Sequence, residues 1–183
     1  PYLHQELAWK RIASDQIGRS TIIATGTGSG KTECFLYPML DHCARQRQKG
    51  IKAIVIYPMN ALATDQAKRF AREIFNAPDL KGKLRVGLFV GGREEKTIKS
   101  MAIDSVITDK DSLRADPPDI LLTNYKMLDF LLIRPVDRQL WRHNGPETLR
   151  YLVVDELHTF DGAQGTDLAC LIRRLKGRLL TSE

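Results

Sequence analysis

Short runs of apolar residues alternate with segments of helical periodicity along the whole of this 183-residue chain. The apolar runs, which are short enough to be buried strands, are 21–24, 53–57, 84–90, 120–122 and 151–154. Helical spacing links the apolar residues elsewhere, beginning with a helix that carries Leu3, Leu7, Ala8 and Ile12. Strands that are apolar on both faces are typical of a parallel sheet covered by helices. The pattern therefore predicts one α/β domain with three αβα layers and a mainly parallel sheet.

Composition narrows the class of protein. The hydrophobic fraction of 43% and the charged fraction of 27% are ordinary for a soluble globular protein. No apolar run approaches the roughly 20 residues of a membrane span, and we identify no secretory leader. The three cysteines form no CxxC pair, which argues against a disulfide framework or a zinc site. We therefore expect a cytoplasmic protein without a membrane partner, and we interpret the chain as a piece of a longer protein.

A glycine-rich segment follows the first predicted strand directly and leads into a helical pattern. Its residues are Thr25, Gly26, Thr27, Gly28, Ser29, Gly30, Lys31 and Thr32. Glycines let several backbone N–H groups converge on phosphate oxygens, and the start of a helix adds the positive end of its dipole. Lys31 would neutralise the β- and γ-phosphates of ATP, and the Thr32 hydroxyl would hold Mg²⁺. The segment predicts an ATP phosphate-binding loop; the alternative is a glycine-rich turn with an incidental lysine.

Two acidic residues, Asp155 and Glu156, end the last predicted strand, where a carboxylate would emerge beside the phosphate loop. Asp155 would hold the Mg²⁺, and Glu156 would orient and deprotonate the attacking water. The alternative is that acidic residues end a buried strand because they meet solvent there. Together with Lys31 and Thr32, the two carboxylates favour a hydrolytic nucleotide site.

TGTGSGKT at 25–32 and DELH at 155–158 together resemble the superfamily 2 helicases of the DEAD/DEAH type, and among them the bacterial YprA-like and Lhr-like DNA helicases. Thr25 stands where the strict phosphate-loop motif has glycine, and threonine is usual there in this family. The resemblance covers the chain from Tyr2 to about Arg178 and implies the first RecA-like domain of an ATP-dependent helicase. It also implies that Gln5 reads adenine and that Tyr2 stacks on the same base, although Gln5 by itself could be a surface residue.

The resemblance further implies a set of residues that bind one nucleic-acid strand through its backbone. They are Pro58, Asn60, Ala61, Leu62, Ala63, Gln66, Gly91, Gly92, Thr123 and Asn124. His158 matches the residue that couples hydrolysis to strand binding, and the turn after it would approach the strand through Thr159, Asp161, Gly162 and Gln164. Each has a structural alternative: Pro58 could simply end a strand, Gly91 and Gly92 could form a tight turn, and Asn124 is well placed to cap the helix that follows. The set nevertheless follows the ends of predicted strands, where such sheets bind ligands.

Charge and aromatic content refine the expected mode of binding. The net charge of +6 favours a polyanionic partner, although the basic clusters at 45–49, 81–85 and 173–178 are most simply solvated faces. Aromatic residues are few and are not interleaved with those clusters, which argues against a base-stacking platform. We therefore expect sequence-independent contact with the sugar-phosphate backbone.

The resemblance leaves alternatives open. The partner is a single-stranded or duplex nucleic acid, and DELH with the segment YPMNALATDQ favours DNA over RNA. An RNA helicase domain remains the nearest alternative, and a nucleotide-dependent switch without unwinding activity is the alternative from another class. The family's Ser-Ala-Thr segment and its second RecA-like domain, which supplies an arginine finger, are not reached by Glu183. We expect the intact protein to contain both.

Overall fold

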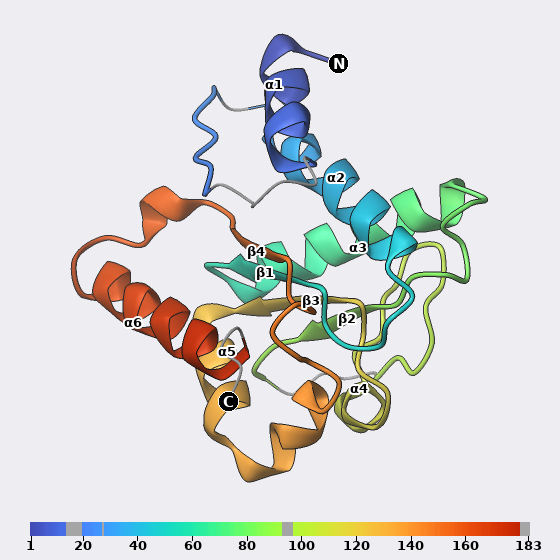
Figure 1. Ribbon diagram of the computed structural model, residues 1–183, viewed down its shortest axis with the longest axis vertical. Coiled ribbons are helices and arrows are strands. Elements are labelled where there is room, and N and C mark those ends of the chain that lie inside the picture. The colour runs from blue at the N-terminus through green and yellow to red at the C-terminus, as the bar shows by residue number, and fades with distance from the viewer. Residues whose placement is uncertain (14–19, 27, 93–96, 180–183) are drawn as a thin grey trace. The chain divides into compact units, whose positions relative to one another are not determined.

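The computed structural model describes residues 1–13, 20–26, 28–92 and 97–179 (Figure 1). These residues group into two compact units, Pro1–Arg47 and Gln48–Glu183. None of the described helices combines the length and the apolar character needed to cross a bilayer.

The first unit consists of two helices, α1 (Leu3–Ile12) and α2 (Lys31–Arg45), which pack against each other. Both were predicted from helical spacing, and both are confirmed. The predicted strand at 21–24 is wrong, because residues 21–24 form no strand and Ile22 is 81% exposed. A strand needs a hydrogen-bonded neighbour, and the described residues of this unit provide none.

The second unit contains a four-stranded sheet. Its strands are β1 (Ala53–Tyr57), β2 (Val86–Phe89), β3 (Ile120–Asn124) and β4 (Tyr151–Val154). Its helices are α3 (Asn60–Asn76), α4 (Lys110–Ala115), α5 (Tyr125–Ile133) and α6 (Gly162–Leu179), with 3-10 helices η1 (Pro135–Trp141) and η2 (Leu157–Thr159). The strand order is β2-β3-β1-β4, and all three pairings are parallel, as the apolar runs predicted. Parallel pairing brings the carboxyl ends of all four strands to one edge of the sheet.

Helices cover both faces of this sheet. In Figure 1, α3 lies on one side of the strands, and α5 and α6 lie on the other. Ile54 and Ile56 of β1 point into the core that α5 and α6 complete, whereas α3 packs against β1, β2 and β3 from the opposite side. The predicted three-layer arrangement is therefore confirmed in the second unit. The outer strand β4 has a single neighbour and is only partly buried, which the uniformly apolar pattern did not predict.

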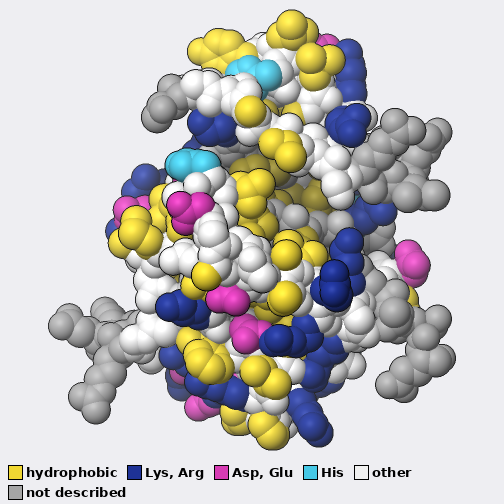
Figure 2. Space-filling model, turned by 90° about the vertical axis from the view of Figure 1, so that its left-hand side faces the viewer, with side chains coloured by type: hydrophobic (Ala, Val, Ile, Leu, Met, Phe, Trp, Pro, Cys, Tyr) yellow, Lys and Arg dark blue, Asp and Glu magenta, His cyan; other side chains and the backbone are white. Residues whose placement is uncertain are grey.

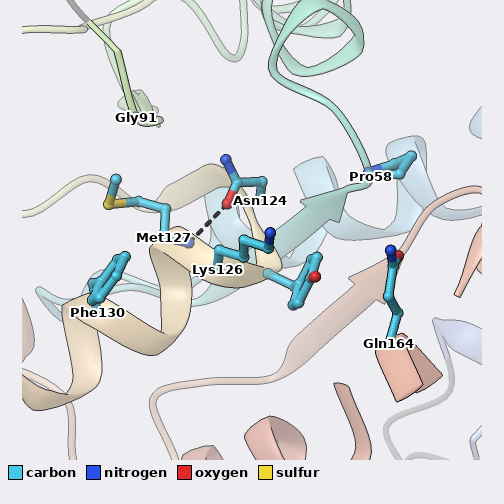
Figure 3. A pocket seen from close by; sticks show the side chains of 8 residues that line it. Pro58, Gly91, Asn124, Lys126, Met127, Phe130 and Gln164 are labelled. Atoms are coloured by element: carbon cyan, nitrogen blue, oxygen red, sulfur yellow. Dashed lines mark hydrogen bonds between the residues drawn. The ribbon is translucent and has the colours of Figure 1, made fainter. Parts of the chain in front are cut away.

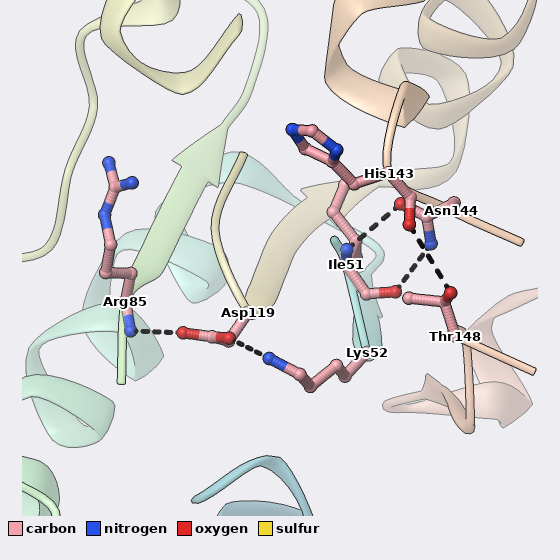
Figure 4. Close-up of polar contacts among 7 residues, drawn as sticks. All are labelled: Ile51, Lys52, Arg85, Asp119, His143, Asn144 and Thr148. Carbon is pink, nitrogen blue, oxygen red and sulfur yellow. Dashed lines mark hydrogen bonds and ion pairs between the residues drawn. The ribbon is translucent and has the colours of Figure 1, made fainter. Parts of the chain in front are cut away.

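A buried ion pair fastens the opposite edge, where the strands begin (Figure 4). The side chain of Lys52, only 3% exposed, pairs with Asp119, and the same carboxylate accepts a hydrogen bond from the backbone N–H of Arg85 at 2.8 Å. Asp119 thus joins the segments that enter β1, β2 and β3. Asn144 adds a second link, because its side-chain amide bonds both the N–H and the C=O of Ile51, at 3.0 and 2.8 Å.

The Lys52–Asp119 pair generates a test of stability. Asp119→Asn leaves a buried ammonium without its counter-charge, so the free energy of unfolding should fall by about 3 kcal/mol or more in urea titrations followed by circular dichroism. Lys68→Ala is the control, because Lys68 and Asp65 form an exposed pair 3.9 Å apart, worth less than about 1 kcal/mol. Equal losses in the two variants would show that the buried pair does not secure this edge.

Candidate functional site

The phosphate loop at 25–32 lies in the first unit and is held by side chains of α1. Gln5 is buried, and its amide accepts a hydrogen bond from the N–H of Tyr2 at 2.9 Å and donates one to the carbonyl of Gly30 at 3.1 Å. Trp9 donates to the carbonyl of Glu33 in the first turn of α2, at 2.9 Å. Gln5 therefore supports the loop through its hydrogen bond to Gly30, and its contact with adenine stays a prediction.

Polar contacts also close the loop on itself. The hydroxyls of Thr25 and Ser29 lie 2.6 Å apart, and the Lys31 ammonium donates to the carbonyls of Thr25 and Gly26 at 3.0 and 3.2 Å. The Lys31 ammonium thus lies at the start of the loop, where a phosphate would compete with the carbonyls of Thr25 and Gly26 for its protons. Thr32 follows in the first turn of α2. Thr27, also predicted to bind nucleotide, falls outside the described residues.

The glycines leave room for such a phosphate. A Cβ atom added at Gly26 or Gly28 would meet nothing within 4 Å, so the loop is open where the backbone N–H groups are required. Gly30 is the N-cap of α2 with a φ of 79°, and a Cβ there would collide with the Gln5 amide. The loop therefore leaves room for a phosphate group at Gly26 and Gly28, and a side chain at position 30 would be strained.

The DELH segment lies in the second unit, immediately after β4. Asp155 continues the ladder, because its N–H donates to the carbonyl of Ile56 at 3.0 Å, and its carboxylate accepts from the N–H of Glu156 at 2.9 Å. Glu156 has a φ of 49° and is the only non-glycine residue with a positive φ in the described part of the chain. Its carboxylate lies 3.4 Å from Nδ1 of His158, and both side chains are exposed to solvent. The predicted base thus occupies a strained backbone conformation, of a kind that often marks functional residues.

A buried tyrosine lies beside this segment. Tyr57 ends β1 next to the point where Asp155 leaves β4, and its hydroxyl has no hydrogen-bond partner among the described residues. Burial raises the pKa of Tyr57 well above its ordinary value, and the negative charge of Asp155 raises it further, while Arg69 lowers it. The phenol therefore stays protonated at every physiological pH.

Lys31 and Thr32 belong to the first unit, whereas Asp155 and Glu156 belong to the second. The joint action of these four residues on one nucleotide stays a prediction. No cluster of three or more metal-ligating side chains occurs among the residues that the structure describes.

Three turns at the carboxyl edge of the sheet are tied together by two asparagines. Asn60, after β1, donates to the carbonyl of Gly91, after β2, at 3.0 Å. Asn124, at the end of β3, donates to the side-chain oxygen of Asn60 at 2.6 Å and caps α5 by accepting from the N–H of Met127 at 2.7 Å. The Thr123 hydroxyl donates to the carbonyl of Phe89 at 2.6 Å. The structure thus brings together Asn60, Gly91 and Asn124, which sequence reasoning assigned to strand binding, and the predicted cap at Asn124 is confirmed.

The remaining residues that were predicted to bind the nucleic-acid strand lie close to this cluster or on α3. Gly92 has a φ of 109°, a conformation that favours glycine. Ala61 is exposed in the first turn of α3, whereas Gln66, a further turn along, is half-buried and its side-chain oxygen has no hydrogen-bond partner among the described residues. Pro58 stands at the end of β1.

A pocket of about 360 Å³ opens at the same edge (Figure 3). We call it the edge pocket; it is lined by Pro58, Gly91, Asn124, Tyr125, Lys126, Met127, Phe130 and Gln164. Sequence reasoning had named Pro58, Gly91, Asn124 and Gln164 but missed the four residues of α5. The available signal was the spacing of Met127 and Phe130 after Asn124, which places both on one side of the helix that Asn124 caps.

Two basic residues near the end of α6, Arg174 and Arg178, make contacts with α5. Figure 2, which views the side of the molecule on the left of Figure 1, shows Lys and Arg side chains spread among hydrophobic ones on its lower half. Arg174 pairs with Asp129, and Arg178 donates to the carbonyl of Leu132, so both arginines fasten α6 to α5. Both side chains are nevertheless exposed, so the prediction of a solvated face holds for them, and the contacts with α5 are an addition to it.

Comparisons with known proteins identify the family and several relatives. The profile of the DEAD/DEAH box helicase family matches residues 2–182. The chain is 27% identical to the Druantia protein DruE of Escherichia coli (strain UMEA 4076-1), over 98% of this chain and 15% of that protein. It is 33% identical to the uncharacterized ATP-dependent helicase YprA of Bacillus subtilis (strain 168), over 96% of this chain and 20% of that protein. The chain therefore spans about a fifth or less of these relatives.

The fold is also similar to a solved structure, that of Mycobacterium smegmatis helicase Lhr bound to ssDNA and AMP-PNP. The TM-score is 0.70 at 25% sequence identity, and the match covers 97% of this chain and 21% of the Lhr chain. The RecA-like α/β fold expected from the sequence is confirmed by this likeness.

The strained backbone at Glu156 generates a prediction. Glu156→Gly and Glu156→Ala both remove the carboxylate, but only glycine adopts a φ of 49° without strain. The glycine variant should therefore be more stable than the alanine variant by about 1 kcal/mol in thermal or urea unfolding. Equal stability of the two variants would mean that the segment relaxes and that the left-handed conformation is not imposed by its surroundings.

Proposed function

Because this chain belongs to the DEAD/DEAH box helicase family, we propose that it is the ATP-binding motor domain of an ATP-dependent DNA helicase or translocase. In this proposal it is the first of two RecA-like domains, and ATP is bound and hydrolysed where the two domains meet. The intact protein would track or separate nucleic-acid strands as hydrolysis proceeds.

The observation that carries the proposal is the tie between Asn60, Gly91 and Asn124. It fixes three turns at one edge of the sheet, and each of these turns matches a segment that contacts the strand in this family. Turns that served only to connect a strand to a helix would not need a shared network of side-chain amides. A rigid row of turns is the support that a sugar-phosphate backbone requires if it is to be held without reading its sequence.

The nucleotide would be held by the loop at 25–32 and by the DELH segment. Lys31, now bonded to two loop carbonyls, would exchange them for phosphate oxygens, and the loop glycines would let backbone N–H groups approach. Thr32 and Asp155 would hold Mg²⁺, which neutralises charge on the β- and γ-phosphates when bound. Glu156 would orient the attacking water and accept its proton, with Gln5 facing adenine and His158 linking the site to the strand.

In this proposal the bound nucleic acid is DNA rather than RNA. The Lhr relative was solved with ssDNA, and the resemblance of YPMNALATDQ and DELH to DNA helicases points in the same direction. Contacts from turns to phosphates would make binding independent of sequence and sensitive to salt.

Lys31→Ala and Glu156→Gln test the nucleotide site in the intact protein. Both variants should lose DNA-stimulated ATP hydrolysis, because the first removes the charge that faces the phosphates and the second removes the base. Glu156→Gln should retain nucleotide binding, measured with a fluorescent ATP analogue. Loss of binding in Glu156→Gln would assign Glu156 a structural role instead.

The proposed second domain has its own test. Residues 1–183 alone should bind ATP weakly and hydrolyse it about 10³-fold or more slowly than the intact protein, because an arginine finger contributes at least that factor. Turnover is measured by phosphate release at saturating ATP. A rate equal to that of the intact protein would contradict the shared site.

A further inference from the structure

The edge pocket differs in chemistry from the turns around it. The turns present backbone and amide groups, whereas α5 contributes the apolar surfaces of Tyr125, Met127 and Phe130 to the pocket. Phe130 is 44% exposed, although burial of a phenyl ring is favourable. The exposed ring of Phe130, beside the edge that is a candidate for nucleic-acid binding, could pack against a ligand that has a flat apolar face.

Cations accompany both aromatic rings of the pocket. The guanidinium carbon of Arg134 lies 4.4 Å from the centre of the Phe130 ring, and the ammonium of Lys126 lies 5.9 Å from that of Tyr125. Paired rings and cations are the combination by which proteins hold single strands, since rings stack on bases while cations meet phosphates. These pairs of a cation and a ring could not be predicted from the sequence, because Lys126 and Arg134 lie outside the basic clusters that charge patterning identifies.

Hydrogen bonds order part of the rim of the pocket before any ligand binds. Gly91 and Asn124 are held by Asn60, so this side of the pocket needs no ordering when a ligand enters. On the other side stands Gln164, from the first turns of α6, whose side-chain amide has no hydrogen-bond partner among the described residues (Figure 3). An amide offers both a donor and an acceptor, so it suits the polar edge of any base.

We propose that the edge pocket receives one base of the bound strand, with Phe130 stacking on its face and Gln164 meeting its polar edge. The inference rests on the proposed function and adds to it a base contact that backbone binding alone does not include. A volume of about 360 Å³ lies within the range of sites for small organic ligands. Every base has a stackable face, so the contact favours no sequence. Lys126 and Arg134 would lie near the flanking phosphates.

Two fluorescent strands of equal length test the base contact in the intact protein, one of oligothymidine and one without any bases. Phe130→Ala should weaken binding of oligothymidine about tenfold, the effect expected for one lost stacking contact, and should leave binding of the abasic strand unchanged. Phe130→Tyr should bind both strands as the unsubstituted protein does. Affinities are measured by fluorescence anisotropy at fixed salt, and circular dichroism verifies that each variant is folded.

Ile133→Ala is the matched control, because Ile133 is 57% exposed on the same helix but does not line the pocket. It should change neither affinity. An equal loss for both strands in Phe130→Ala, or no loss for either, would overturn the base contact while leaving backbone binding intact. Failure of the unsubstituted protein to bind either strand would overturn the proposed function, and the pocket proposal with it.

Discussion

Because all four described strands run parallel, their carboxyl ends emerge at a single edge of the sheet, and the rest of the described architecture depends on this pairing. The register brings Tyr57 opposite Asn124 and Ile56 opposite Val154, so the turns that follow β1, β3 and β4 start side by side. Residues more than 60 positions apart in the sequence, such as Asn60 and Asn124, can then share one hydrogen bond. An antiparallel arrangement would send these turns to opposite edges and divide the candidate site.

The two edges of the sheet differ in the interactions that their residues make. At the amino edge, Asp119 pairs with the buried Lys52 and bonds the backbone of Arg85, so the entries to three strands are fixed by one carboxylate. At the carboxyl edge, polar groups bond one another near solvent, and Glu156 is held in a left-handed conformation. Such a division is expected of a domain in which one edge secures the fold and the other carries strain for chemistry.

Much of the fold could be predicted because its signal is local. The apolar runs at 53–57 and 151–154 became strands with those bounds, and Asn124 caps α5 as its position after a strand indicated. The run at 21–24 misled, because an apolar run predicts burial but not a partner, and strand formation depends on a neighbour far away in the sequence. The left-handed conformation of Glu156, in the turn between β4 and η2, could not be foreseen either, since a glutamate side chain does not favour it.

The candidate site was predictable to the extent that short motifs carry their own geometry. The loop at 25–32 has the support of α1 and the open backbone that its glycines imply. The edge pocket was missed because its wall is built from single residues of α5 that become a surface only when β1, β2 and α6 surround them. Aromatic residues counted along the chain argued against stacking, and it is their arrangement in space that motivates the proposed base contact.

We propose that a DNA strand held at the carboxyl edge of the sheet accelerates ATP hydrolysis by the intact protein. The most direct test compares its hydrolysis rate with ATP alone, with single-stranded DNA, and with RNA of the same length and sequence. The account predicts that DNA accelerates hydrolysis, and does so more than RNA. Stronger acceleration by RNA would contradict the assignment to DNA, and no acceleration by either strand would contradict the motor itself.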